Sequence, residues 1–226
     1  MTPPGQPPYL HPAYVSTRKR APLAPFVAAP LTPSETTGPA FGPADVPAGA
    51  EDLTRQLPGA PLGQRIFVDG RVVDEDGRAV AGALVEVWQA NAAGRYRHEA
   101  DQFDAPLDPS FLGAGRTLTG PDGSYRFVTI RPGAYPWKNH DNAWRPAHIH
   151  FSLFGPAFAG RLVTQMYFEG DPLLAFDPIL HSIPDADARA ALVARFDLGT
   201  TEHFRALGYR FDIVLGGPRA TPREAP

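Results

Sequence analysis

The stretch RTLTGPDGSYRFV, residues 116–128, decides the fold class. Its centre, GPDG at residues 120–123, combines residue types that favour tight turns, and β-forming residues lie on both sides of it. A similar arrangement occurs upstream, where residues 65–73 and 83–88 carry branched apolar residues around the turn DEDG at residues 74–77. We therefore predict short strands in both stretches, each pair joined by a hairpin-like link.

Further short strands are predicted for three segments, 147–153, 162–168 and 209–215. In the last of them, Tyr209 and Phe211 alternate with the charged residues Arg210 and Asp212, as expected of a strand with one buried face. The 27 prolines and 22 glycines interrupt the chain too often for long helices. These features predict an all-β fold of the β-sandwich type.

One accessory helix is predicted over residues 185–196, where Ser182 and Asp185 have the spacing of a capping box. The stretch 91–115 is too long for a simple turn. Long loops on a rigid sandwich often carry binding and catalytic residues. We therefore expect functional side chains in this stretch.

Residues 1–62 differ from the rest of the chain because they are rich in proline, alanine, glycine and threonine and show little periodicity. We predict an extended N-terminal arm here, followed by a β-sandwich domain over residues 63–226. Apolar residues such as Tyr9 and Tyr14 indicate that the arm lies over a core or a partner, since a solvated tail has few of them.

Composition excludes several classes of function. A formal net charge of −3 gives no basic surface for nucleic acid. Without cysteine the chain forms neither disulfides nor thiolate metal sites, so any metal must bind through nitrogen and oxygen. The first residues lack a signal-peptide pattern and no apolar run is long enough to span a membrane, which predicts a cytoplasmic protein.

The motif RPAHIHF at residues 145–151 places two imidazoles, His148 and His150, on the same face of a predicted strand. A pair of this kind can bind a metal ion, but it also occurs as two partly exposed strand histidines. Common two-histidine metal sites are completed by a carboxylate. One pattern needs an acid two residues after the first histidine, and that position is His150. Another needs a glutamate shortly after the pair, and residues 151–155 contain no acid.

Tyrosines are the remaining candidates: Tyr96 lies in the stretch NAAGRYRH at residues 91–98, and Tyr135 in PGAYPW at residues 132–137. A free phenol has a pKa near ~10, so binding as phenolate at neutral pH requires a strong Lewis acid. Phenolates combined with imidazoles favour Fe(III) over Zn(II) or Fe(II). Taken singly, each tyrosine is better explained as a core or loop aromatic.

Several ordered motifs resemble the intradiol ring-cleavage dioxygenases over most of the chain from about residue 34. They are VEVWQAN at 85–91, GRY at 94–96, APLDP at 105–109, AYPW at 134–137, WRPAHIH at 144–150 and QMYFEGDP at 165–172. The resemblance implies a β-sandwich of mixed topology, related to the transthyretin-like fold, and makes residues 63–226 the catalytic domain.

The resemblance also implies a non-haem Fe(III) site whose ligands are Tyr96, Tyr135, His148 and His150. Tyr135 would leave the metal when substrate binds, and Arg145 and Gln165 would act on the ring as it gains charge. The residues implied in substrate binding are Tyr14, Trp137, Arg145, Gln165, Tyr167 and Ile179.

Within the family, the chain is most similar to the branch that cleaves protocatechuate with O₂ to 3-carboxy-cis,cis-muconate, a step of the β-ketoadipate pathway. The catechol and hydroxyquinol branches use a helical N-terminal segment for homodimerisation, whereas residues 1–62 show no helical periodicity. The resemblance therefore implies a homologous α subunit that forms an αβ protomer in a larger oligomer, with neither a membrane nor nucleic acid as partner.

Two alternatives stay open at the level of the sequence. One is a homo-oligomeric catechol or hydroxyquinol 1,2-dioxygenase. The other is a metal-free β-sandwich binding module, because the strand and turn pattern of residues 70–80 also resembles carrier and adhesion domains.

Overall fold

Strand β1 (Arg65–Asp74) lies at the centre of one half of the sheet. It pairs antiparallel with β4 (Ser124–Ile130), and parallel with both β10 (Leu207–Arg210) and β11 (Ile213–Leu215). The structure is a computed structural model that describes residues 5–25, 27, 45–137, 144–154 and 161–224.

The other half of the sheet is built around β2 (Leu84–Trp88). This strand lies between β3 (Ala114–Leu118) and β7 (His148–Phe154), and β7 pairs on its other side with β8 (Leu162–Phe168). All three pairings are antiparallel. The register matters for function because β7 begins with both histidines singled out in the sequence.

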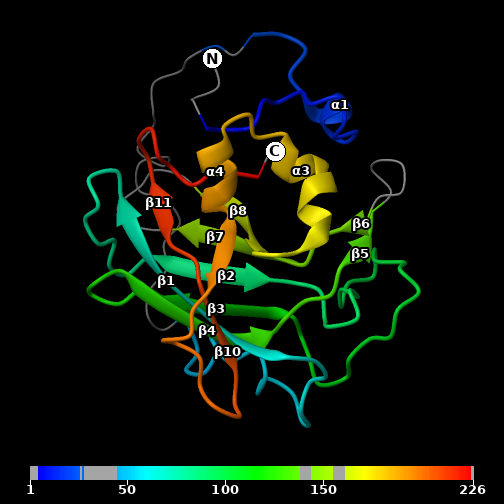
Figure 1. Cartoon of the computed structure of the whole chain (residues 1–226), viewed down its shortest axis with the longest axis vertical. Coiled ribbons are helices and arrows are strands. Elements are labelled where there is room, and N and C mark those ends of the chain that lie inside the picture. The colour runs from blue at the N-terminus through cyan, green and yellow to red at the C-terminus, as the bar shows by residue number, and fades with distance from the viewer. Residues whose placement is uncertain (1–4, 26, 28–44, 138–143, 155–160, 225–226) are drawn as a thin grey trace.

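Strand β9 (Val193–Phe196) joins the two halves, since it pairs parallel with β8 and antiparallel with β10. The described strands thereby form a nine-stranded mixed sheet that is nearly closed (Figure 1). A separate two-stranded ladder joins β5 (Tyr135–Pro136) to β6 (Trp144–Arg145). This architecture confirms the predicted all-β sandwich of mixed topology.

Aromatic side chains from both halves fill the core. The ring of Phe151 in β7 lies 6.0 Å from Tyr125, 6.3 Å from Phe127 and 5.1 Å from Phe211, measured between ring centroids. Contacts of this kind follow from the period of two in each strand, which directs alternate side chains inward.

The helices among the described residues are short. They are α1 (Thr17–Arg20), the 3₁₀ helix η2 (Pro172–Phe176), α3 (Pro178–His181) and α4 (Ala186–Ala191). Figure 1 shows α3 and α4 over one end of the strands. None of the helices in these ranges has the length and apolar character needed to cross a membrane.

The predicted helix 185–196 was wrong in its second half. It ends at Ala191, and Val193–Phe196 forms β9 because pairing with two neighbouring strands outweighs local helical propensity. The predicted capping box was also wrong. Asp185 caps α4 through Ala188 N at 2.9 Å, whereas Ser182 follows α3 and its hydroxyl donates to Ile179 O.

Both predicted turns form, but the prediction of hairpin-like links was wrong, because the two strands that flank each turn do not pair with each other. Gly77 N donates to Asp74 O at 3.0 Å, and Gly123 N to Gly120 O at 2.9 Å. Yet β1 does not pair with β2, nor β3 with β4, because each turn leads from one half of the sandwich to the other. The predicted strand 209–215 also divides into β10 and β11, with the expected alternation of burial.

Two parts of the predicted N-terminal arm pack against the sheet. Tyr14 is buried, and Leu53 belongs to the main core, where its backbone N–H donates to Val128 O at 2.8 Å. Residues 1–4, 26 and 28–44 lie outside the described ranges. The division between arm and catalytic domain at residue 62 stays a prediction.

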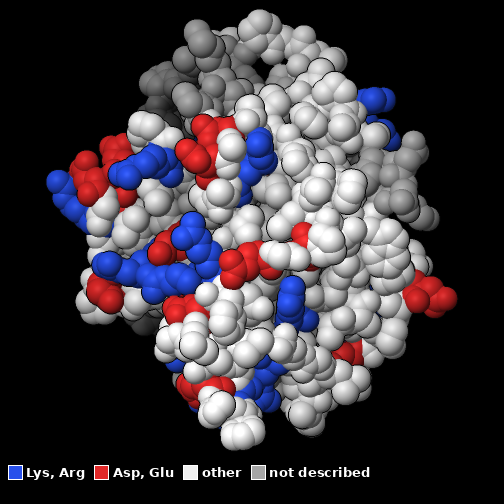
Figure 2. All heavy atoms as spheres, in the orientation of Figure 1, with Lys and Arg blue, Asp and Glu red and all other residues white. Residues whose placement is uncertain are grey.

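Charged side chains of both signs are interspersed on the face shown in Figure 2. They gather on the side where β1 and β11 lie, while the opposite side of this face is mostly uncharged. The pattern gives this face no single-sign field of the kind that attracts a polyelectrolyte.

Replacing Phe151 by alanine is expected to lower the free energy of unfolding by about 3–5 kcal/mol, because it removes a fully buried ring from the centre of the core. Denaturant unfolding followed by fluorescence measures the change. The matched control is Phe176→Ala, whose ring is 71% exposed and should change stability by about 0.5 kcal/mol or less. Equal effects of the two substitutions would contradict this description of the core.

Candidate metal centre and pocket

His148 and His150 lie at the start of β7 with their ring centroids 5.0 Å apart. The ladder places Trp88 of β2 and Gln165 of β8 directly opposite His150. The Trp88 ring stacks on His150 at 4.8 Å with an interplanar angle of 3°, so the plane of this imidazole is set by β2.

The surroundings of His148 fix which nitrogen is available. Its Nδ1 lies 2.7 Å from Pro146 O, which makes Nδ1 the protonated nitrogen and leaves a lone pair on Nε2. Nε2 lies 3.2 Å from the Tyr135 hydroxyl and 3.1 Å from Arg145 Nη1. Burial, together with the Arg145 charge, holds the pKa of His148 well below its usual value, so the imidazole is neutral.

Tyr96 lies in a loop that touches the start of β5, where Tyr135 lies, and the two ring centroids are 5.3 Å apart. Gly94 allows the contact: its φ is +81°, and an added Cβ would lie 2.2 Å from Ala134 O. The backbone N–H of Tyr96 donates to Asp101 Oδ2 at 2.7 Å, which holds the Tyr96 loop in place.

These four side chains converge from three separate segments. The Tyr135 ring lies 5.3 Å from His148, and the Tyr96 ring 6.3 Å from His150. The Tyr96 hydroxyl and His150 Nδ1 are buried without a hydrogen-bond partner among the described residues. Burial, and then the neighbouring Tyr135, raises the pKa of Tyr96 well above its usual value. Buried polar atoms without partners call for a missing ligand or ion.

The donor set suits a metal ion of particular chemistry. No cluster of three or more histidine, cysteine, aspartate or glutamate residues able to hold a metal occurs in the described part of the chain. The side chains that converge here offer phenol oxygens together with imidazole nitrogens as donors. Among common ions, a strongly Lewis-acidic ferric ion fits such donors best.

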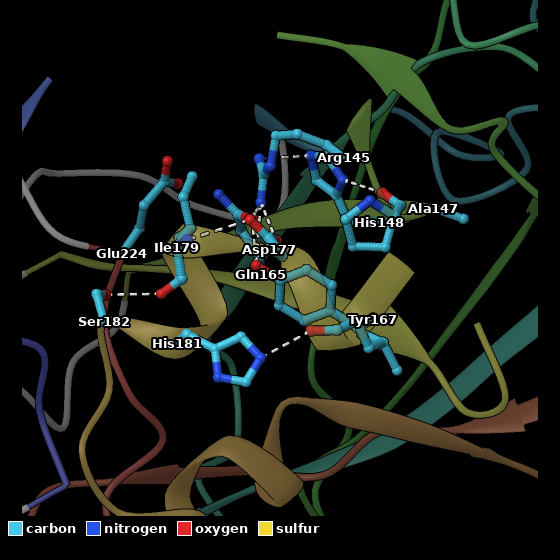
Figure 3. A network of polar contacts seen from close by, with 12 residues as sticks. Arg145, Ala147, His148, Gln165, Tyr167, Asp177, Ile179, His181, Ser182 and Glu224 are labelled. Atoms are coloured by element: carbon cyan, nitrogen blue, oxygen red, sulfur yellow. Dashed lines mark hydrogen bonds and ion pairs between the residues drawn. The ribbon is translucent and has the colours of Figure 1, made fainter. Parts of the chain in front are cut away.

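Arg145 is a buried cation beside His148 (Figure 3). Its Nη2 donates to Gln165 Oε1 at 2.6 Å, to the Tyr167 hydroxyl at 3.0 Å and to Asp177 Oδ2 at 2.8 Å. Burial alone would lower the pKa of Arg145, but the Asp177 charge more than offsets it and the pKa lies well above the usual value. The guanidinium is therefore fixed in both position and charge.

Asp177 was not recognised in the sequence, although it has two functions in the fold. One carboxylate oxygen pairs with Arg145, and the other accepts from Ile179 N at 3.1 Å and so caps α3. The cap could have been inferred from Asp177 preceding Pro178, since this order is typical of a helix start. The ion pair depends on the tertiary fold and has no local signal.

The remaining predicted residues form a wall beside this network. Tyr14 packs edge-on against Trp137 at 5.4 Å and also contacts Ile179, while Arg20 Nη2 donates to the Tyr14 hydroxyl at 2.5 Å. The Arg145 guanidinium lies 5.4 Å from the Trp137 ring. The N-terminal segment around Tyr14 therefore packs beside the candidate site.

A cavity of about 730 Å³ opens in front of these side chains. Of the predicted residues, its lining includes Tyr96, Tyr135, Trp137 and His150. The other predicted residues are not part of this lining, namely Tyr14, Arg145, His148, Gln165, Tyr167 and Ile179. Residues of the cavity wall that sequence reasoning missed are Trp88, His98, Ala100, Asp101, Gln102, Phe103, Asp104 and Pro136.

Comparison with known proteins gives three consistent matches. A family model described as dioxygenase matches residues 36–217. The chain is 58% identical to the protocatechuate 3,4-dioxygenase beta chain of Burkholderia cepacia, over 98% of this chain and 94% of that one. It is 32% identical to the alpha chain from the same organism, over 84% of this chain and 94% of that one.

Solved structures give the same picture of the fold. The crystal structure of 3-chlorocatechol 1,2-dioxygenase from Rhodococcus opacus 1CP matches with a TM-score of 0.58 and 25% sequence identity. The match covers 80% of this chain and 70% of that one.

Replacing Asp177 by asparagine is expected to lower the free energy of unfolding by about 3–5 kcal/mol, because a buried guanidinium loses its only carboxylate partner in the described residues. Denaturant unfolding measures the loss. Asp185→Asn is the matched control: it also caps a short helix but is exposed, and asparagine caps about as well as aspartate. Wild-type stability of Asp177→Asn would show that the ion pair does not hold Arg145.

Proposed function

The chain belongs to the dioxygenase family that includes protocatechuate 3,4-dioxygenases and catechol 1,2-dioxygenases, and on this premise we propose that it is the iron-bearing β-type subunit of an intradiol protocatechuate dioxygenase. The observation that carries the proposal is the convergence of two phenols and two imidazoles at the head of β7, with buried polar atoms left without partners. The proposed reaction is cleavage of protocatechuate with O₂ to 3-carboxy-cis,cis-muconate.

We assign four ligands to a non-haem Fe(III), namely Tyr96, Tyr135, His148 and His150. The chemistry that a bound ferric ion supplies is Lewis acidity, which stabilises phenolates and the ionised hydroxyls of a catechol. His148 suits the role because its imidazole is neutral and its Nε2 faces Tyr135. The two tyrosines suit it because the Tyr96 loop touches the start of β5 at Gly94, which brings both phenols to one place.

Tyr135 has a second role as a proton acceptor. Its hydroxyl oxygen lies next to His148 and its ring lines the cavity, so it meets both the ligand set and an incoming substrate. With iron bound, Tyr135 would be placed to accept the hydroxyl proton of a catechol that enters the cavity. The chain thereby carries its own base for ionising the substrate.

Arg145 and Gln165 act behind the ligands. The ion pair with Asp177 and the hydrogen bond to Gln165 hold the Arg145 charge in place before substrate arrives. A cation fixed in advance stabilises negative charge on the ring at no cost in reorganisation. Tyr167 and Ile179 support this arrangement, since Tyr167 donates to Gln165 Oε1 at 2.9 Å and Ile179 follows Asp177 in α3.

Trp137, with Tyr14 packed against it, provides an apolar wall for the substrate ring. The described lining of the cavity contains Asp101 and Asp104 but no arginine or lysine. A substrate carboxylate therefore needs positive charge from beyond this lining. We assign that contribution to a homologous α subunit, which agrees with the similarity of the chain to both alpha and beta chains.

The alternatives are less well supported. A metal-free binding module does not explain why two phenols and two imidazoles meet in a buried place. A homo-oligomeric catechol or hydroxyquinol dioxygenase does not explain the near full-length similarity to a beta chain.

A steady-state assay of O₂ uptake tests the function directly. With a co-expressed α chain, kcat/KM for protocatechuate should exceed that for catechol and for hydroxyquinol by about 10–100-fold, because a charge-assisted contact to the carboxylate contributes about 1.5–3 kcal/mol. Without the α chain this preference should be lost. Equal turnover of catechol and protocatechuate by the complete protein would refute the assignment of substrate.

Two substitutions test the ligand assignment. His148→Ala should abolish stable iron binding. Tyr135→Phe should keep much of the iron but slow substrate binding, because the Tyr135 oxygen that leaves the metal and accepts the substrate proton is lost. Metal analysis and stopped-flow absorption measure these effects, with the exposed His203→Ala as control. Full iron content in His148→Ala, or wild-type binding kinetics in Tyr135→Phe, would contradict the assigned roles.

A further inference from the structure

The C-terminal tail, residues 217–224, is bound along the edge of β8. Thr221 N donates to Val214 O at 2.9 Å, Thr164 Oγ1 to Pro222 O at 2.6 Å, and Glu224 N to Val163 O at 2.7 Å. In Figure 1 the last described residues of the chain, drawn in red, lie near α3 and α4. The tail thus reaches the side of the sheet on which the candidate metal centre lies.

The N-terminal segment fastens the same tail. Gln6 Oε1 accepts from Arg223 N at 2.8 Å, and Gln6 Nε2 donates to Thr221 O at 3.5 Å. Gln6 and Thr221 are both buried. These contacts hold the tail backbone at several points up to Glu224 N.

The Glu224 carboxylate faces His150. Its Oε2 lies 3.4 Å from His150 Nδ1, and the Glu224 side chain is mostly buried, with 22% of its surface exposed. Gln165 Nε2, also buried and without a hydrogen-bond partner in the described residues, belongs to the same small space beside Glu224 (Figure 3).

The two candidate ligand histidines differ in whether their Nδ1 atom has a hydrogen-bond partner. His148 Nδ1 is satisfied by Pro146 O at 2.7 Å, whereas His150 Nδ1 has no hydrogen bond to any described residue. A histidine that binds a metal through one nitrogen nearly always donates the other N–H to a carboxylate, carbonyl or water, and this partner fixes the tautomer. Trp88 covers the face of the His150 ring, so a partner has to approach Nδ1 in the ring plane.

We propose that Glu224 is a positioning residue that accepts a hydrogen bond from His150 Nδ1 and thereby directs His150 Nε2 to the metal. The proposal rests on the metal centre proposed above. The present separation of 3.4 Å exceeds a hydrogen bond by only a few tenths of an ångström. A small rotation of either side chain is enough to close it. Glu224 of the tail thus supports a ligand that lies in β7.

The experiment compares Glu224→Ala, Glu224→Gln and the control Arg223→Gln in the full-length, iron-loaded protein with its α chain. Arg223 is the exposed neighbour in the same tail, and its backbone bond to Gln6 is unaffected by the substitution. The readouts are the rate of iron loss to excess chelator, the position of the visible absorption band of the ferric tyrosinate, and the thermal midpoint of the iron-free protein.

Glu224→Ala should lose iron about 10–100-fold faster than wild type and shift the visible band, because His150 is no longer oriented. Glu224→Gln should partly restore both properties through its amide oxygen, and Arg223→Gln should match wild type. The thermal midpoint of the iron-free protein should be the same for Glu224→Ala and Arg223→Gln.

Iron loss at the wild-type rate in Glu224→Ala, with an unchanged band, would overturn the role of Glu224 while leaving the proposed function intact. Faster loss accompanied by a lowered thermal midpoint of the iron-free protein would also overturn it, since the tail would then act on stability alone. A wild-type protein that takes up no iron would refute the proposed function, and this inference with it.

Discussion

The register of β7 between β2 and β8 is the constraint on which the rest of the site depends. It directs His148 and His150 to the same side of the strand and sets Trp88 and Gln165 directly opposite His150. A slip of one residue would turn both imidazoles to the other face of the sheet. The core holds this register because Phe151, the next residue along β7, packs among aromatic rings from the other half of the sandwich.

Around this strand the protein places charges that neutralise each other before any ligand arrives. Arg145 and Asp177 form a pair with almost no exposed surface, and burial together with the Arg145 charge keeps His148 neutral. Breaking such a pair is costly, whereas the intact pair contributes little net stability. Its value therefore lies in function, because it holds a cation rigidly behind the metal ligands and next to the substrate wall.

Much of the fold could be predicted from the sequence, because strands and turns leave local signals. The alternation in residues 209–215 and the turns at Asp74–Gly77 and Gly120–Gly123 are examples. Strand partners could not be predicted in this way, since pairing joins residues far apart in the chain, and for the same reason β9 was mistaken for the end of a helix. In the site, the family resemblance indicated the side chains that the structure brings together. It gave no sign of Asp177 or Glu224, whose contacts exist only once distant segments have folded together.

The account predicts one ferric ion whose protein ligands are two tyrosines and two histidines. The most direct test is anomalous diffraction at the iron edge from crystals of the iron-loaded protein. A single peak within bonding distance of the hydroxyl oxygens of Tyr96 and Tyr135 and of Nε2 of His148 and His150 is the predicted result. A peak elsewhere in the protein, or one that excludes either tyrosine, would contradict it.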